Sequence, residues 1–92
     1  MNQCLRITFL LKDAEGFLPN NVRSEAQTLG IEGIAQAVEQ GKIKIIACGP
    51  KDSIEQFVDF LHAQAAKTNL EDIQVEPILK ERDYRGVFRV IE

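Results

Sequence analysis

The chain has 92 residues, of which 45% are hydrophobic, and this size suits a single domain over residues 1–92 with one core. A formal charge of −3 gives no general attraction to nucleic acid or to an anionic membrane, since both favour clustered Lys and Arg, so neither is expected as a partner. The apolar runs are too short to span a membrane, and the single His with no cluster of Cys or His argues against a metal site.

The first predicted element is a strand over residues 3–11, with the sequence QCLRITFLL. Its large apolar side chains recur at every second position, at Leu5, Ile7, Phe9 and Leu11. This period of two is typical of a strand with one buried face. We therefore expect a central strand of a sheet.

A loop and a short helix are predicted next, over residues 12–30, KDAEGFLPNNVRSEAQTLG. Asn20 and Asn21 are candidate N-caps, and Gly30 is placed to end the helix. Three apolar residues fall on one face of this helix: Val22, Ala26 and Leu29. The segment has the outline of a loop that carries a strand into a helix past a bound anion.

A hairpin and a longer helix follow. The hairpin arms lie near residues 33–39 and 42–48, with a turn at Gln40 and Gly41. In GPKDSIEQFVDFLHAQAAK, Pro50 suits a first helical turn, and Asp52 with Glu55 resembles a capping box. The apolar stripe that must cover the sheet consists of Ile54, Phe57, Val58, Leu61 and Ala65.

Two more strands are predicted in IQVEPIL and GVFRVI, and Pro77 indicates an edge or irregular position for the first of them. The order of elements fits an α+β fold: a ferredoxin-like two-layer sandwich with two helices on one face of an antiparallel sheet of four to five strands. Between these strands, KERDYR (residues 80–85) is most simply a solvated turn, and Tyr84 with its arginine neighbours is the alternative, a partner surface. Fold alone does not give function.

The middle of the chain resembles a known family. Residues 29–62, LGIEGIAQAVEQGKIKIIACGPKDSIEQFVDFLH, are similar to an acylphosphatase, whose pattern runs L-G, then G-W-V-x-N, a hairpin with Gly at its turn, and E-G-P before an amphipathic helix. The terminal YRGVFRVI resembles the closing strand of that family. The resemblance implies an acylphosphatase-like fold and the hydrolysis of acyl phosphates without a cofactor.

The family's signature loop, V-Q-G-V-G-F-R, implies a phosphate cradle of backbone amides closed by an arginine. In this chain the arginine position falls on Leu18, or on Pro19 when counted back without a gap from Gly30. The cradle itself would be formed by candidates in this segment: Glu15, Gly16, Phe17, Leu18, Asn20 and Asn21. Asp13 and Glu15 would repel an anion, and Pro19 removes one donor.

The family's second catalytic residue is the Asn of G-W-V-x-N, implied to position the attacking water. That pentad corresponds here to residues 33–37, so Ala37 takes the place of the Asn. Arg23 is a weak candidate to replace the missing arginine, because it lies about one helical turn beyond the expected place. The alternative is a solvated helix residue that pairs with Glu15 or Asp13.

Cys4 and Cys48 are the only cysteines, and they have no C-x-x-C spacing. In a chain without a signal peptide they predict reduced, inert thiols and a cytoplasmic location. The family fold implies that their strands are neighbours, so a redox pair is the alternative. His62 is expected to be a surface residue.

Three functions follow from these patterns. The main hypothesis is a catalytically degenerate acylphosphatase-like protein that acts as a small binding or interaction module. The first alternative is a divergent acylphosphatase that hydrolyses acyl phosphates to carboxylate and phosphate, and the second is a regulatory small-molecule-binding domain. The expected partners are phosphate or another small anion, or a protein, and the expected state is a monomer or weak homodimer.

Overall fold

The computed structural model describes residues 2–11, 18–39, 41–67, 70–80 and 83–91. The described residues form five strands, β1 (Asn2–Leu11), β2 (Glu32–Glu39), β3 (Lys42–Pro50), β4 (Leu70–Ile78) and β5 (Phe88–Ile91). A π-helical turn, η1 (Leu18–Val22), runs into the helix α1 (Arg23–Thr28), and the longer helix α2 (Lys51–Ala65) follows β3. The elements lie where the sequence predicted them.

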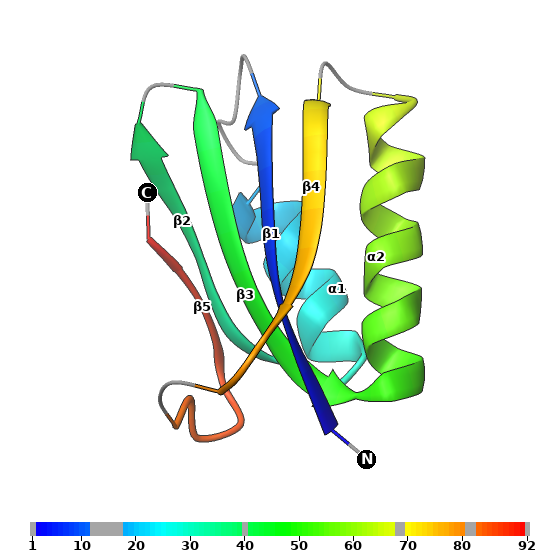
Figure 1. The fold of residues 1–92 in the computed structure, drawn as a ribbon, viewed down its shortest axis with the longest axis vertical. Coiled ribbons are helices and arrows are strands. Elements are labelled where there is room, and N and C mark those ends of the chain that lie inside the picture. Colours follow the sequence, from blue (N-terminus) through cyan, green and yellow to red (C-terminus); the bar gives the residue numbers. More distant parts are fainter. Residues whose placement is uncertain (1, 12–17, 40, 68–69, 81–82, 92) are drawn as a thin grey trace.

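The strands form one sheet in the order β4-β1-β3-β2-β5 (Figure 1). The pairs β1–β4, β1–β3 and β2–β3 are antiparallel, whereas β5 pairs with β2 in parallel. The predicted ferredoxin-like α+β sandwich is confirmed, and its sheet is mixed rather than wholly antiparallel. The parallel pair arises because the chain after β4 crosses to the opposite edge at the same end of the sheet, so β5 starts level with β2. The edge position of β4 fits Pro77.

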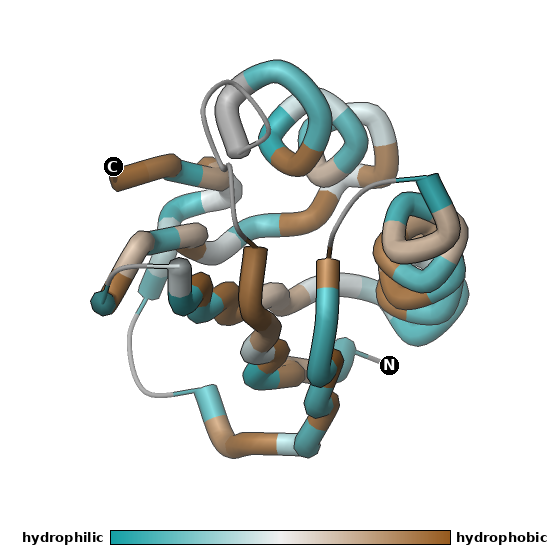
Figure 2. Tube along the Cα trace, turned by 90° about the horizontal axis from the view of Figure 1, so that it is seen from above, coloured by the Kyte–Doolittle hydropathy of each residue, from teal (hydrophilic) through white to brown (hydrophobic). Residues whose placement is uncertain are grey.

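Both helices cover one face of the sheet, and the chain after β4 crosses the other face (Figure 2). The core lies between the helices and the sheet. Its fully buried side chains include Ile7 and Phe9 of β1, Ile43 and Ile45 of β3, and Phe57 of α2. Side chains at the intervening positions of these strands point to the helix-free face, because alternate residues of a strand face opposite sides. No helix among the described residues is long and apolar enough to cross a membrane.

The apolar stripe of α2 packs as predicted: Ile54, Phe57 and Leu61 are buried, and Val58 and Ala65 are half-buried against the core. The start of α2 differs from the prediction. Pro50 is the N-cap, with φ −58° and ψ 146°, and no side chain caps the helix. Asp52 falls inside the first turn instead of at the N-cap, so the predicted capping box with Glu55 is wrong.

Helix α1 also starts differently from the prediction. Its N-cap is Val22, in a helical conformation and without a side-chain cap, because η1 continues directly into α1. Asn20 and Asn21 are exposed within η1, so they are not the N-caps that the sequence predicted. The end is as expected: Gly30 has φ 71°, and the Ile31 amide donates to the Ala26 carbonyl, which completes a glycine C-cap.

The β2–β3 hairpin turns through Gly41, whose φ of 78° suits glycine. Gln40, the other predicted turn residue, lies outside the described residues. Gly33, near the start of β2, is a position where the structure leaves no room for a side chain. A Cβ at this position would run into the backbone carbonyl of Ile46 on β3, and the φ of 149° also disfavours a side chain.

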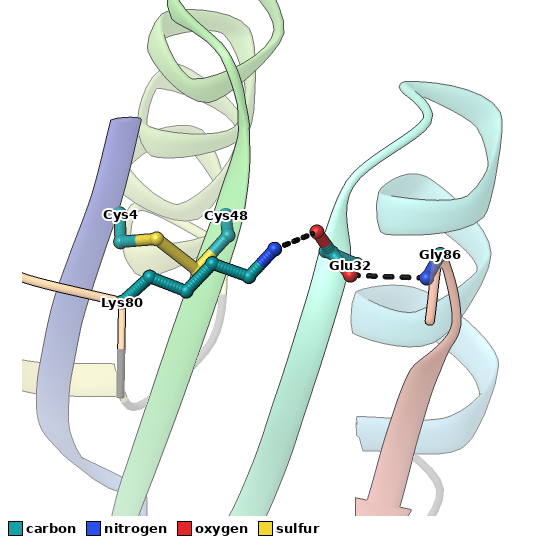
Figure 3. The surroundings of a disulfide bond; sticks show 5 residues. All are labelled: Cys4, Glu32, Cys48, Lys80 and Gly86. Atoms are coloured by element: carbon teal, nitrogen blue, oxygen red, sulfur yellow. Dashed lines mark hydrogen bonds and ion pairs between the residues drawn. A yellow bond between two sulfur atoms is a disulfide. The ribbon is translucent and has the colours of Figure 1, made fainter. Parts of the chain in front are cut away.

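Cys4 and Cys48 are joined by a disulfide, with Cα atoms 4.1 Å apart. They are directly opposite in the β1–β3 register, and the disulfide lies on the helix-free face (Figure 3). The prediction of two reduced thiols is therefore wrong, and the redox-pair alternative has the right geometry. Sequence spacing alone could not decide this, because the 44-residue separation is closed only by strand pairing.

Candidate functional site

The candidate anion-site residues that the structure describes belong to η1 and to the C-terminal part of β2. Figure 1 places η1 at the same end of the sheet as the C-terminal end of β2. Asp13, Glu15, Gly16 and Phe17 lie outside the described residues.

The described part of the loop begins with the backbone of Leu18 and Pro19, the two alternative arginine positions, in η1. Asn20 and Asn21 are exposed. Successive backbone amides at the first turn of a helix have no partner within the helix, and they form an environment that favours an anion. Pro19 contributes no amide to this set.

Arg23 is the first residue of α1, directly after η1, and its side chain is exposed. Within the described segments it takes part in no ion pair, since the salt bridges there join Arg6 to Glu76 and Lys80 to Glu32. The alternative partners expected for Arg23, which are Asp13 and Glu15, lie outside the described residues.

Ala37 lies opposite Ile43 of β3, next to a register shift between Ala37 and Glu39, and it is exposed. It follows Ala35 by two positions, so it is on the face of the sheet that carries the helices. Its methyl group can neither donate nor accept a hydrogen bond, and so it cannot orient a water molecule.

A second charged cluster lies at the other end of β2. Glu32 Oε1 accepts a hydrogen bond from Lys80 Nζ at 2.8 Å, and Glu32 Oε2 accepts one from the Gly86 amide at 3.0 Å (Figure 3). These two hydrogen bonds lower the pKa of Glu32, and the bond to Glu32 raises the pKa of Lys80. Lys80 belongs to the KERDYR segment, so part of that segment is fixed to the sheet instead of being freely solvated.

Sequence reasoning missed this cluster because 48 residues separate Lys80 from Glu32. No local spacing signals such a pair. His62 is exposed in the last turn of α2, as predicted. The described residues contain no group of three or more His, Cys, Asp or Glu that could hold a metal ion.

A family model described as acylphosphatase matches residues 16–90. The chain belongs to the acylphosphatase family. The match begins at Gly16, so it includes most of the candidate loop as well as β2 and both helices.

Curated acylphosphatases are similar to this member of the family. The one from Coxiella burnetii (strain RSA 493 / Nine Mile phase I) is 30% identical over 78 residues, which cover 79% of this chain and 82% of the relative. The one from Halorhodospira halophila is 29% identical over 55 residues, and the matched part spans only 60% of each protein.

Solved structures give the same assignment. The structure of an acylphosphatase from Coxiella burnetii superposes with a TM-score of 0.81 at 27% identity, covering 97% of this chain and 92% of that one. The acylphosphatase from Bacillus subtilis covers both chains completely, with a TM-score of 0.77 at 19% identity. At this lower identity the likeness shows the fold alone.

Proposed function

We propose that this acylphosphatase-family chain is a divergent acylphosphatase that hydrolyses small acyl phosphates to a carboxylate and phosphate. The observation that carries the proposal is Arg23, which is exposed, directly follows η1 and takes part in no ion pair with another described residue. The similarity to curated acylphosphatases over most of the chain supports the same reaction.

In the proposed reaction, backbone amides of residues 16–20 other than Pro19 hold the phosphate oxygens, and Arg23 adds a positive charge. Water attacks phosphorus, the bond between phosphorus and the acyl oxygen breaks, and the carboxylate leaves with the bonding electrons. The water proton passes to solvent. No cofactor is needed, because an acyl phosphate is already activated.

The proposed enzyme would be slow. With Ala37 in place of the family's Asn, the chain has no amide there to orient the water. Loss of one preorganised polar group at a reaction centre typically costs about 10² to 10³ in rate. We therefore expect turnover far below that of a chain carrying both family residues.

A second candidate function is a small anion-binding or protein-binding module that has lost hydrolysis. The exposed methyl of Ala37 favours it, because the water-positioning group is missing at a place where the scaffold is otherwise retained. A cytoplasmic location and a monomeric or weakly dimeric state remain predictions for either function.

The deciding experiment is hydrolysis of a small aryl acyl phosphate by the purified chain, corrected for spontaneous hydrolysis. The wild type is compared with Arg23→Ala and with a Leu18→Arg, Ala37→Asn double variant. Lys51→Ala is the matched control, because it removes an exposed cation from the first turn of α2. We expect hydrolysis in the wild type and in Lys51→Ala, and at least a tenfold loss in Arg23→Ala.

A wild type without activity, together with activity gained by the double variant, would contradict the enzyme proposal and favour the module. Equal activity in the wild type and in Arg23→Ala would remove Arg23 from the site. A double variant at least tenfold faster than the wild type would support the view that the scaffold is retained and only its polar groups have changed.

A further inference from the structure

A hollow of about 340 Å³ lies on the helix-free face of the sheet, between the start of β2, the turn before β5 and β5 itself. We call it the arginine hollow, because Arg85 and Arg89 both line it. Arg89 is opposite Ile34 in the parallel β2–β5 register, and both alternate with buried neighbours, so both side chains point away from the helices. Ala37 lies near the other end of β2, on the opposite face of the sheet.

The arginine hollow is lined by two exposed guanidiniums. Arg85 and Arg89 are both exposed, and neither takes part in an ion pair within the described part of the chain. A guanidinium presents a planar set of donors that matches the oxygens of a phosphate or carboxylate, and two of them on one hollow favour a doubly charged anion. This local charge contrasts with the net charge of −3 on the whole chain.

Apolar and aromatic side chains form part of the lining beside these polar groups. Ile34 and the ring of Tyr84 are half-buried, and Ile91 is 50% exposed. Apolar walls with a few convergent polar groups are typical of small-molecule sites, and the volume is at the small end of their range. The lining therefore suits an anion that carries an aromatic or aliphatic group better than a bare inorganic ion.

The turn that carries Arg85 is held in place before any ligand arrives. Arg85 has a φ of 55°, a left-handed conformation that is unfavourable for a residue with a side chain. Three hydrogen bonds hold this turn. The Arg85 amide donates to Asp83 Oδ1 at 2.8 Å, and the Gly86 amide donates to Glu32. The Val87 carbonyl accepts a hydrogen bond from the Gly33 amide. Binding of a ligand would therefore require little additional free energy to order this turn.

We propose that the arginine hollow binds a small aryl phosphate monoester, with the phosphate between Arg85 and Arg89 and the ring against Ile34, Tyr84 and Ile91. Asp83 also lines the hollow, so its carboxylate opposes the anion and keeps the affinity moderate. The site is separate from the proposed hydrolytic site and does not depend on it.

The test is calorimetric titration of phenyl phosphate into the purified chain at low salt, with inorganic phosphate and phenol titrated separately. The variants are Arg89→Gln and Arg85→Gly, and glycine suits the left-handed backbone at residue 85, so the second variant keeps the turn. Arg6→Gln is the matched control, since Arg6 is on the same face of β1 but is paired with Glu76 outside the hollow.

We expect phenyl phosphate to bind the wild type and Arg6→Gln alike, and each hollow variant to bind at least tenfold more weakly. Asp83→Asn should bind more tightly. Absence of binding to the wild type, or equal binding to both hollow variants, would overturn the proposal. Loss of binding in Arg23→Ala would assign the ligand to the other site and also overturn it. Inorganic phosphate binding as tightly as phenyl phosphate would refute the role of the apolar walls.

Discussion

Lys80 donates a hydrogen bond to Glu32 across the helix-free face of the sheet, at 2.8 Å between Nζ and Oε1. Together with the bond from the Gly86 amide, this contact fastens the chain segment that crosses from β4 to β5. The crossing decides which strand β5 pairs with, so the position of the last strand depends on a contact between residues far apart in sequence.

The Glu32 contact predicts a pH dependence of stability. Because the folded state lowers the pKa of Glu32, the ionised carboxylate stabilises the fold fully above its ordinary pKa of 4.5, and this contribution is lost as the pH falls through the lower folded value. We expect Glu32→Gln to lower the urea midpoint at pH 7 and the difference from wild type to shrink below pH 4.5. The prediction would be contradicted if the difference in urea midpoint between the two proteins stayed constant down to pH 3, which is about 1.5 units below the ordinary pKa of Glu32.

Gly33→Ala should be severely destabilising. The added methyl meets backbone that cannot rotate away, and we expect a loss of about 3 kcal/mol or more in the free energy of unfolding, measured by urea denaturation. Gly30→Ala is the matched control. That glycine also has positive φ, but nothing lies within 4 Å of the added atom, so a cost of about 1 to 2 kcal/mol is expected. Equal costs for both variants would rule out the clash.

The Cys4–Cys48 disulfide should contribute about 2 to 4 kcal/mol, because it closes a long loop in the unfolded chain. A Cys4→Ala, Cys48→Ala double variant should unfold at lower urea, and reductant should shift the wild type toward it without affecting the variant. Two thiols that react with maleimide in the unfolded, unreduced wild type would show that the disulfide is not formed.

Phe57→Ala should cost about 3 to 5 kcal/mol, because Phe57 is fully buried and its ring lies 6.3 Å from that of Phe60 and 6.1 Å from that of Phe88. Leu79→Ala serves as the control: Leu79 is 88% exposed, and its removal should change stability by less than about 0.5 kcal/mol. Thermal denaturation of both variants measures the contrast. Similar melting temperatures for the two variants would argue against Phe57 as a centre of the core.

The faces of the main elements could be predicted from the sequence because the signals for them are local. The alternation in β1, the stripe of α2 and the glycine at the end of α1 each reflect the periodicity or backbone freedom of a few adjacent residues. Helix starts were predicted less well, since η1 runs into α1 and Pro50 caps α2 without a side chain. Those outcomes depend on how the preceding segment enters the helix.

The sequence by itself determined the class of fold and the faces of its main elements. Only the tertiary structure decided the parallel pairing of β5, the disulfide between Cys4 and Cys48, the Glu32–Lys80 contact and the hollow that Arg85 and Arg89 share. The physical reason is distance along the chain. Each of these features joins residues from different elements. It therefore forms only when the strands have paired in their register and the segment between β4 and β5 crosses the sheet.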